Sequence, residues 1–334
     1  MIAIHNDNTG FHPRWVAYCE SRSIAYKRVN CHDSNIIEQL RDCEALFWHH
    51  NHGSSKDLLI AKPILFALEH AGIKVFPNFK TGWHFDDKLS QKYLFEALRI
   101  PHVKTEVFVQ MKDAIEFLKC TSFPVVFKLK RGAGSKNVQR VNNLSSGEKL
   151  LSKAFRKGFR PIDTRGFLKD TFAKVLKGKN SLVQLFKAFA HLWVPFELEK
   201  SAGREKGYVY FQEFIPNNAF DIRVIVIGNK AFAIKRLVRK NDFRASGSGS
   251  ILYEKEEFED ETIKFAFEIS EKFDSDCIAY DFVYKEEKPL LVEISYGFAA
   301  EGYDACTGYW DSELKWYPGS FNPYGWMIEK VMNN

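Results

Sequence analysis

The sequence predicts an α/β protein whose C-terminal part is α+β, and three observations support this class. Over the first 80 residues, short apolar runs alternate with helical patterns, which is typical of a parallel sheet with crossover helices. After residue 208, strong apolar strands joined by turn residues dominate. Apolar residues make up 45% of the 334 residues, as in an ordinary folded protein. A chain of this length has room for several domains, and we expect parts at residues 1–82, 83–215 and 216–334.

The N-terminal part is predicted to be a small parallel sheet. Strands are expected at residues 1–5, 25–30, 45–50 and 74–77, and helices at 11–22, 36–43 and 56–71. Parallel sheets bind ligands at the carboxyl ends of their strands, and these ends are polar here. The third strand runs into His49, His50 and His52, which indicate either a metal site or a polar loop that touches substrate. No carboxylate at a recognised metal spacing accompanies them, which favours the loop. The glycine-rich dinucleotide fingerprint is absent, which argues against a nicotinamide site.

The remaining elements are predicted from hydrophobic periodicity. Helices are expected at residues 86–99, 113–119 and 260–273, and strands at 103–109, 124–130, 138–141, 208–215, 221–227, 230–238, 278–284 and 289–295. Gly228-Asn229 and the charged turn at 285–288 predict two hairpins. Residues 151–206 are rich in phenylalanine but lack clear periodicity, so no element is predicted there.

Charge and cysteine usage narrow the class of protein. The 48 Lys and Arg against 42 Asp and Glu give a net charge of +6. Residues 151–206 alone carry 13 basic and 5 acidic residues, so this segment holds the excess. Six cysteines without a C-x-x-C pair indicate reduced thiols. The sequence shows neither a signal peptide nor a membrane-spanning apolar run, so we expect a cytoplasmic protein without a membrane span.

Two segments have the composition of a nucleotide site. Lys128 lies on a predicted strand, which is followed by a loop that contains Gly132, Gly134 and Ser135, whose amides can fold over phosphate. The loop lacks the Gly-Lys-Ser/Thr ending of a Walker motif and can also be an ordinary turn. Further along, Gln212, Glu213, Phe214 and Ile215 end a strand and can offer backbone groups to an adenine edge, with Asp221 positioned for a ribose hydroxyl.

Cationic and acidic residues follow on the C-terminal strands. Guanidinium groups suit phosphate and carboxylate oxygens, and candidates are Arg223, Arg236 and Arg244. Asp281 and Glu293 lie on two strands of one predicted hairpin, where facing side chains come within about 5 Å. Oxygen ligands of this kind favour Mg²⁺ or Mn²⁺. The alternative is a pair of carboxylates on an exposed sheet face.

Taken in order, these residues resemble the ATP-grasp superfamily of carboxylate–amine ligases, in particular the branch of ribosomal-protein glutamate ligases and amino-acid ligases. The matching stretches lie at residues 87–88, 125–138, 209–223, 231–244 and 278–295. The resemblance implies an ATP-grasp fold preceded by a small Rossmann-like parallel-sheet domain.

The resemblance also implies a role for each candidate residue. Lys88 and Lys128 would hold ATP phosphates beneath a lid formed by the glycine loop, and residues 212–215 would be the adenine hinge. The three arginines would face the γ-phosphate or acyl phosphate. Asp281 and Glu293 would hold magnesium, with manganese as the alternative. Ser295 stands where the family usually has asparagine, which implies either a weaker second metal site or a water molecule in its place.

The implied reaction is ATP-dependent ligation of a carboxylate and an amine through an acyl phosphate, with release of ADP and phosphate. The aromatic tail at residues 296–326 also suits sugar rings, which keeps open a ligase that joins an amino acid to a sugar acid in surface-polysaccharide synthesis. The serine at 295 keeps open a nucleotide-binding protein without ligase activity. The basic segment 151–206 suggests an acidic or sugar-containing acceptor; a nucleic-acid partner lacks any recognised motif, and an oligomer is compatible with the sequence.

Overall fold

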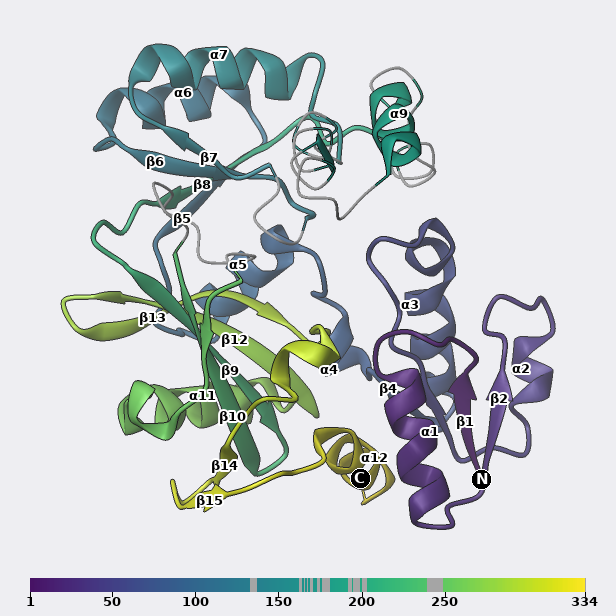
Figure 1. Cartoon of the computed structure of the whole chain (residues 1–334). Helices are drawn as coiled ribbons and strands as arrows, with labels where there is room; N and C mark the ends of the chain where they lie inside the picture. The colour runs from purple at the N-terminus through teal and green to yellow at the C-terminus, as the bar shows by residue number, and fades with distance from the viewer. Residues whose placement is uncertain are drawn as a thin grey trace. The chain divides into compact units, whose positions relative to one another are not determined.

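The computed structural model (Figure 1) describes residues 1–132, 137–161, 181–191, 203–238 and 249–333, together with residues 164, 166, 168, 171, 172, 175, 194 and 199. The chain forms two compact units. The first consists of residues 1–85, 93–102 and 217–334, and the second of residues 86–92 and 103–216. The N-terminal sheet thus shares a compact unit with the C-terminal third of the chain.

The N-terminal residues form the parallel sheet that the sequence predicts. Its strands are β1 (Ile2–His5), β2 (Tyr26–Val29), β3 (Ala45–Phe47) and β4 (Lys74–Phe76), in the order β2-β1-β3-β4 with all pairs parallel. The helices are α1 (His12–Ser21), α2 (Ile36–Gln39), α3 (Ser55–His70) and α4 (Phe79–Gly82). Alternating strand residues feed two cores: Ile2, Ile4 and Phe47 belong to one with α1, and Ala3 and Leu46 to another with α3.

An antiparallel sheet dominates the rest of the first unit. It is built from β9 (Phe220–Ile227), β10 (Lys230–Leu237), β11 (Ile251–Leu252), β12 (Cys277–Lys285), β13 (Lys288–Ser295), β14 (Gly308–Asp311) and β15 (Trp316–Pro318), in the order β13-β12-β9-β10-β14-β15 with β11 on β10. Both predicted hairpins are present. The β12–β13 turn uses Glu286 and Glu287, both with positive φ, as a two-residue hairpin turn requires.

The two faces of this sheet have different neighbours. Val224, Tyr280 and Phe282 belong to a core shared with helix α11 (Asp260–Phe273). Ile225 and Ala279, which alternate with them, belong to the core that also contains residues of β1, α1 and the last helix, α12 (Pro323–Asn333). The same sheet therefore carries α11 on one face and is joined to the N-terminal layer through the other.

The second unit has a smaller antiparallel sheet. Its strands are β5 (Thr105–Phe108), β6 (Val125–Lys128), β7 (Gln139–Val141) and β8 (Val209–Glu213), in the order β5-β8-β6-β7, and its helices include α6 (Met111–Cys120) and α7 (Leu144–Phe155). Helix α5 (Lys88–Ala97) begins in this unit and continues into the first. Phe127 of β6 and Phe211 of β8 pack with the two helices. The residues next to each phenylalanine along its strand therefore face the other side of the sheet.

Several elements were not predicted from the sequence. Residues 151–206 include the end of α7 and helix α9 (Leu182–Ala190). Both helices begin with a capping box, Asn143 with Ser146 and Ser181 with Gln184. The aromatic tail forms η2 (Ala300–Tyr303), β14, β15 and α12, and a further short helix η1 spans Lys255–Glu257. In the part of the chain that the structure describes, no helix has the length and apolar character needed to cross a membrane.

Candidate functional site

The predicted arginines and carboxylates of the first unit meet on one face of the antiparallel sheet. The strand register places Asp281 of β12 opposite Glu293 of β13 on one side and opposite Arg223 of β9 on the other. On the next pair of strands, Arg236 of β10 lies opposite Asp221 of β9. Because these residues alternate with the α11-facing ones, strand pairing alone brings five predicted site residues onto one face.

Ion pairs bind four of these residues together. Arg223 donates from Nε to Asp281 Oδ1 and from Nη2 to Asp281 Oδ2, the latter over 2.6 Å. Arg236 donates from Nε and Nη2 to the two carboxylate oxygens of Asp221 over 2.6 and 2.8 Å. Its Nη2 also lies 3.2 Å from Asp281 Oδ2. Arg236 therefore links the two carboxylates, and the cluster forms a continuous chain of alternating charge.

Burial makes these charges interact strongly. Asp281 is 9% exposed and Arg236 is 7% exposed. Burial by itself raises the pKa of Asp281, but the charges of Arg223 and Arg236 lower it further than that, so the carboxylate is ionised. Burial lowers the pKa of Arg223, and the charge of Asp281, together with a contact from the Tyr303 side chain, then raises it well above its usual range. The site thus keeps fixed charges in a poorly solvated environment, which suits the binding of a charged transition state.

The residues expected to hold a metal give a partial ligand set. Asp281 and Glu293 share the sheet face with Ser295, which pairs with Ala279 across the same hairpin. The Ser295 hydroxyl donates to the Gly297 carbonyl over 2.6 Å. Among the described residues there is no cluster of three or more His, Cys, Asp or Glu side chains arranged for a metal. Magnesium usually keeps water or substrate phosphates and needs only one or two carboxylates, so the pair fits a nucleotide-bound ion.

The second unit brings the two predicted phosphate lysines to buried positions. Lys88 is 5% exposed and Lys128 is 8% exposed. The Lys88 Nζ donates to the Gly132 carbonyl over 2.9 Å, and the Gly132 amide donates to Asp86 Oδ1 over 2.9 Å. These contacts hold the start of the glycine loop against the start of α5. Gly132 has φ +126°, a backbone conformation that side-chain-bearing residues rarely adopt.

The predicted adenine hinge leaves the sheet beside Lys128. On β8, Gln212 lies on the same face as Lys128, away from α6 and α7, because it alternates with Phe211. Gln212 is buried, and its Nε2 lies 3.2 Å from Thr105 Oγ1 and 3.3 Å from the Tyr210 hydroxyl. Strand β8 ends at Glu213, so Phe214 and Ile215 form the exit from the sheet.

Four candidates have no position in the structure that bears on their predicted role. Gly134, Ser135 and Arg244 lie outside the described residues. Asp221, predicted to bind a ribose hydroxyl, accepts hydrogen bonds from Arg236 through both carboxylate oxygens. Its ribose role stays a prediction.

The histidine loop belongs to a larger group of imidazoles that the sequence pattern did not reveal. His49 Nδ1 accepts from the Phe11 amide over 3.1 Å, and His12 Nε2 accepts from the His49 amide over 3.1 Å. His5 Nδ1 accepts from the Cys31 amide over 3.1 Å. Burial, aided by neighbouring imidazoles, lowers the pKa of His5 to about 4 and that of His49 to about 3. These rings are neutral at pH 7 and support the backbone at the carboxyl ends of β1 and β3.

Tyr303 is a further site residue that sequence reasoning missed. It follows the end of β13 by eight residues, in η2, and it is 7% exposed. Its side chain contacts Arg223 and contributes to the raised pKa of that guanidinium. A tyrosine in an irregular aromatic tail carries no periodic signal, so nothing in the sequence separated it from its neighbours.

Part of the chain matches a known protein family. Residues 197–309 match the family model of the RimK-like ATP-grasp domain. This segment contains the described candidates from Gln212 to Ser295. No curated protein matches the sequence.

Solved structures extend the likeness over the whole chain. An ATP-grasp protein with a RimK domain from Sphaerobacter thermophilus has a TM-score of 0.60 at 14% identity and covers 99% of each chain. A D-alanine–D-alanine ligase from Bacillus anthracis, solved with ATP, has a TM-score of 0.55 at 12% identity and covers 99% of this chain and 94% of the ligase. N5-carboxyaminoimidazole ribonucleotide synthetase from Thermotoga maritima has a TM-score of 0.59 at 14% identity, and the match covers 99% of this chain and 75% of the synthetase. The predicted ATP-grasp fold is therefore confirmed.

Proposed function

We propose that this chain, which has the ATP-grasp fold, is an ATP-dependent ligase that joins a carboxylate to an amine. The observation that carries the proposal is the buried cluster of Arg223, Arg236 and Asp281, with Glu293 opposite Asp281 across the strand register. A cluster of this kind costs stability unless its charges are paired, and it offers cations and carboxylates on one face. Phosphoryl transfer to a carboxylate needs both.

The reaction divides into two steps. The substrate carboxylate attacks the γ-phosphorus of ATP, the bond to the β–γ bridging oxygen breaks, and ADP leaves. The amine then attacks the acyl phosphate, the amide bond forms, and phosphate and a proton are released. Arg223 and Arg236 would face the transferred phosphoryl group, whose oxygens carry the charge that develops in the transition state.

Nucleotide binding would use groups from the second unit. Lys88 and Lys128 are buried cations next to the glycine loop, and ammonium groups in such positions suit phosphate oxygens. The backbone of residues 213–215 would meet the adenine edge where β8 ends. Asp281 and Glu293 would hold magnesium, which screens the phosphate charge when bound. Ser295 would supply a hydroxyl in place of an amide oxygen.

The test is product formation from defined substrates. Purified protein is incubated with ATP, Mg²⁺ and a panel of carboxylates against a panel of amines, and ADP release is followed together with product mass. A ligase gives ADP release that requires both substrates, and a product whose mass is the sum of theirs minus one water. ATP binding without such dependence would instead support a nucleotide-binding protein without ligase activity.

The aromatic tail favours a sugar acid as the carboxylate substrate. The rings of Tyr309 and Tyr317 are stacked with their centres 5.0 Å apart, and those of Phe321 and Trp326 are stacked with their centres 5.2 Å apart. Lys230 lies 5.1 Å from the centre of the Trp326 ring. Aromatic faces beside cations suit the rings and carboxylates of uronic acids. Uronic acids therefore belong in the carboxylate panel beside amino acids and peptides.

A further inference from the structure

Helix α9 of the second unit turns an apolar face to solvent (Figure 1). Val183 is 62% exposed and Phe186 is 74% exposed, and Ala190 is exposed as well. The Val194 amide donates to the Ala190 carbonyl over 2.9 Å, which sets the exposed Val194 one turn further along. Residues separated by three or four positions lie on one side of a helix, so these four side chains form an apolar stripe.

The opposite side of α9 is the side that faces the protein. Ala188 is buried there and Leu185 is half-buried. The phenylalanine of the stripe thus faces water while an alanine faces the protein, which is the reverse of an ordinary surface helix. The start of the helix is fixed by the capping box of Ser181 and Gln184. An exposed apolar face on a well-capped helix indicates an interaction site.

The segment that carries α9 presents positive charge to solvent. Its described basic residues that are exposed are Lys153, Arg156, Lys157, Lys187, Arg204 and Lys206. Its described acidic residues are not exposed, because Glu199 is buried in an ion pair with Arg160 and Glu205 is half-buried. Arg160 Nη2 also donates to the His191 carbonyl over 3.5 Å, which connects the end of α9 with the basic residues that follow α7.

A partner must satisfy both the apolar stripe and the positive charge. The surface of a bilayer with anionic lipids does so, because its headgroups attract lysine and arginine and its acyl region takes up valine and phenylalanine side chains. A nucleic acid offers phosphates but no hydrocarbon region for valine. A second copy of this chain would bring a segment of the same charge, which repels. We infer that α9 binds the surface of an anionic membrane.

The dimensions of α9 determine how it would bind. Its nine residues span about 14 Å at the rise of an α-helix, less than half of the roughly 30 Å of a hydrocarbon core. The helix would therefore lie in the headgroup region with the stripe towards the acyl chains. Lys187 follows Val183 by one turn, so its ammonium would meet headgroups at the edge of the stripe.

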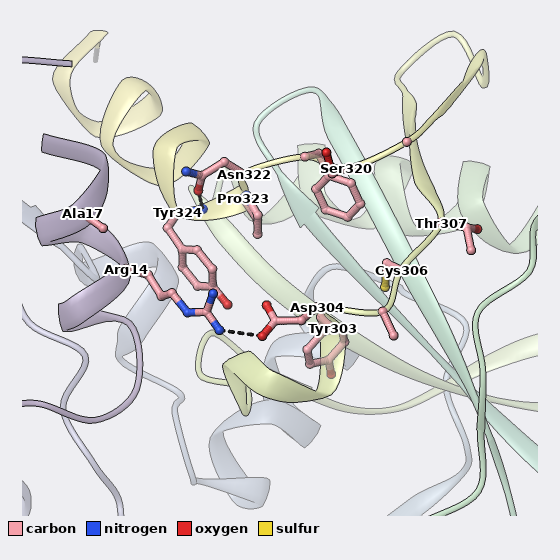
Figure 2. A pocket seen from close by; sticks show the side chains of 13 residues that line it. Arg14, Ala17, Tyr303, Asp304, Cys306, Thr307, Ser320, Asn322, Pro323 and Tyr324 are labelled. Carbon is pink, nitrogen blue, oxygen red and sulfur yellow. Dashed lines mark hydrogen bonds and ion pairs between the residues drawn. The ribbon is translucent and has the colours of Figure 1, made fainter. Parts of the chain in front are cut away.

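The first unit offers a contrasting exposed cation. In the hollow shown in Figure 2, Arg14 Nη2 donates to Asp304 Oδ2 over 2.5 Å, and the Arg14 guanidinium lies 5.7 Å from the centre of the Tyr324 ring. The charge of Arg14 is thus already balanced within the chain. Lys187 has no ionic partner among the residues that the structure describes, so its charge is available to a membrane.

The test is co-sedimentation of the full chain with lipid vesicles. One set of vesicles contains phosphatidylcholine alone, and the other contains phosphatidylcholine with about one third phosphatidylglycerol, which supplies a negative surface potential. Wild-type protein should bind the anionic vesicles at least about tenfold more tightly than the neutral ones. The difference should shrink as added salt screens the charges.

Two variants separate the contributions of the stripe and the charge. Phe186→Ser should weaken binding to anionic vesicles by at least about tenfold, because it removes a side chain that the acyl region would bury. Lys187→Gln should weaken it by about fivefold at low salt. The matched controls are Leu59→Ser on α3, whose side chain is 75% exposed, and Arg14→Gln. Both controls should bind as wild type does.

The inference fails if wild-type protein does not sediment with anionic vesicles, or if Phe186→Ser binds them as tightly as Leu59→Ser. It also fails if ultracentrifugation without lipid shows a dimer that Phe186→Ser dissociates, since a second copy would then cover the face. Val183→Ser is the second probe of the stripe if Phe186→Ser does not fold. The inference goes beyond the proposed ligase function and does not depend on it, because vesicle binding is measured without substrates.

Discussion

The two compact units hold their charged groups in different ways. In the first, Arg223 and Arg236 face carboxylates on neighbouring strands, so the sheet register sets their positions. In the second, Lys88 donates to a loop carbonyl and Lys130 pairs with Asp87 over 2.9 Å, which are contacts between a helix start and a loop. The register of a strand pair fixes the positions of several side chains at once, whereas each position in a loop depends on its own individual contacts. The first unit therefore presents a charge array that strand register fixes, and the second presents two lysines, Lys88 and Lys130, whose positions depend on contacts between the start of α5 and the loop after β6.

The strongest test of this contrast is Glu293→Gln. It removes a carboxylate opposite Asp281 while keeping its shape and leaving the arginine pairs of Asp281 intact. Turnover should fall by about 100-fold or more, as for other single groups that stabilise charge in a transition state. ADP release with saturating substrates measures this, and the melting temperature should stay within a few degrees of wild type. Near-normal turnover would remove Glu293 from the site.

The Asp281→Asn variant should also lose turnover, both because it lacks a carboxylate of the site and because its fold is less stable. From the sequence alone, a carboxylate-to-amide change of this kind would be expected to leave the fold intact. The structure indicates otherwise, because Arg223 would keep a buried charge without its carboxylate partner, whereas Arg236 would still pair with Asp221. Breaking a buried pair in this way costs about 3–5 kcal/mol. Urea unfolding should show this loss for Asp281→Asn and little loss for Glu293→Gln; equal stability of the two would contradict a charge array that strand register fixes.

Lys128→Ala probes the second unit. Removing a buried cation that meets phosphate should weaken ATP binding by roughly 10-fold to 100-fold, in line with the value of a charge-assisted hydrogen bond. Calorimetric titration with a non-hydrolysable ATP analogue measures the effect. Lys119→Ala, which removes an exposed lysine on α6, is the control and should change nothing. An unchanged affinity for Lys128→Ala would count against the phosphate role.

The imidazole group predicts sensitivity to acid. Burial and neighbouring imidazoles lower the pKa of His5 from 6.5 to about 4. Below pH 6.5 the unfolded chain therefore takes up a proton that the folded protein refuses until about pH 4, so stability must fall as pH decreases through this window. His5→Asn keeps an acceptor for the Cys31 amide and removes the titration. Its unfolding free energy should fall less steeply between pH 6.5 and 4.5 than that of wild type.

The smallest expected effect concerns the basic segment. Four basic residues near the start of this segment are Arg156, Lys157, Arg160 and Arg165. Arg160, however, donates to both oxygens of Glu199 over 2.9 and 2.7 Å and so supports the local structure, while Arg165 lies outside the described residues. Arg156 and Lys157 are exposed, and changing both to Gln should raise the acceptor KM about twofold to threefold at low salt. Lys264 and Lys272 on α11, changed likewise, serve as the control.

The comparison also explains what the sequence could predict. Strands with strict alternation and turn residues were located closely, and α11 was predicted with its observed bounds, residues 260–273. Site residues on such strands, including Asp221, Arg223, Arg236, Asp281 and Glu293, came together because register is a periodic property. The capping residues Asn143 and Ser181 were signals that would have located α7 and α9.

The rest depends on long-range packing. Arg14 meets Asp304 only because α1 packs on α12, and no local pattern specifies that contact. Tyr303 lies in an irregular segment, and the imidazole group joins residues from three separate strand ends and turns. Such sites arise where elements distant in sequence meet, which periodicity does not encode.

The central claim is that this chain ligates a carboxylate to an amine at the Asp281–Glu293 face. The most direct measurement is ADP release by wild-type protein and Glu293→Gln across the substrate panels, with product mass determined in parallel. The account predicts release that needs both substrates, a product lighter than their sum by one water, and a loss of about 100-fold in the variant. ADP release that needs neither substrate, or that survives Glu293→Gln, would contradict it.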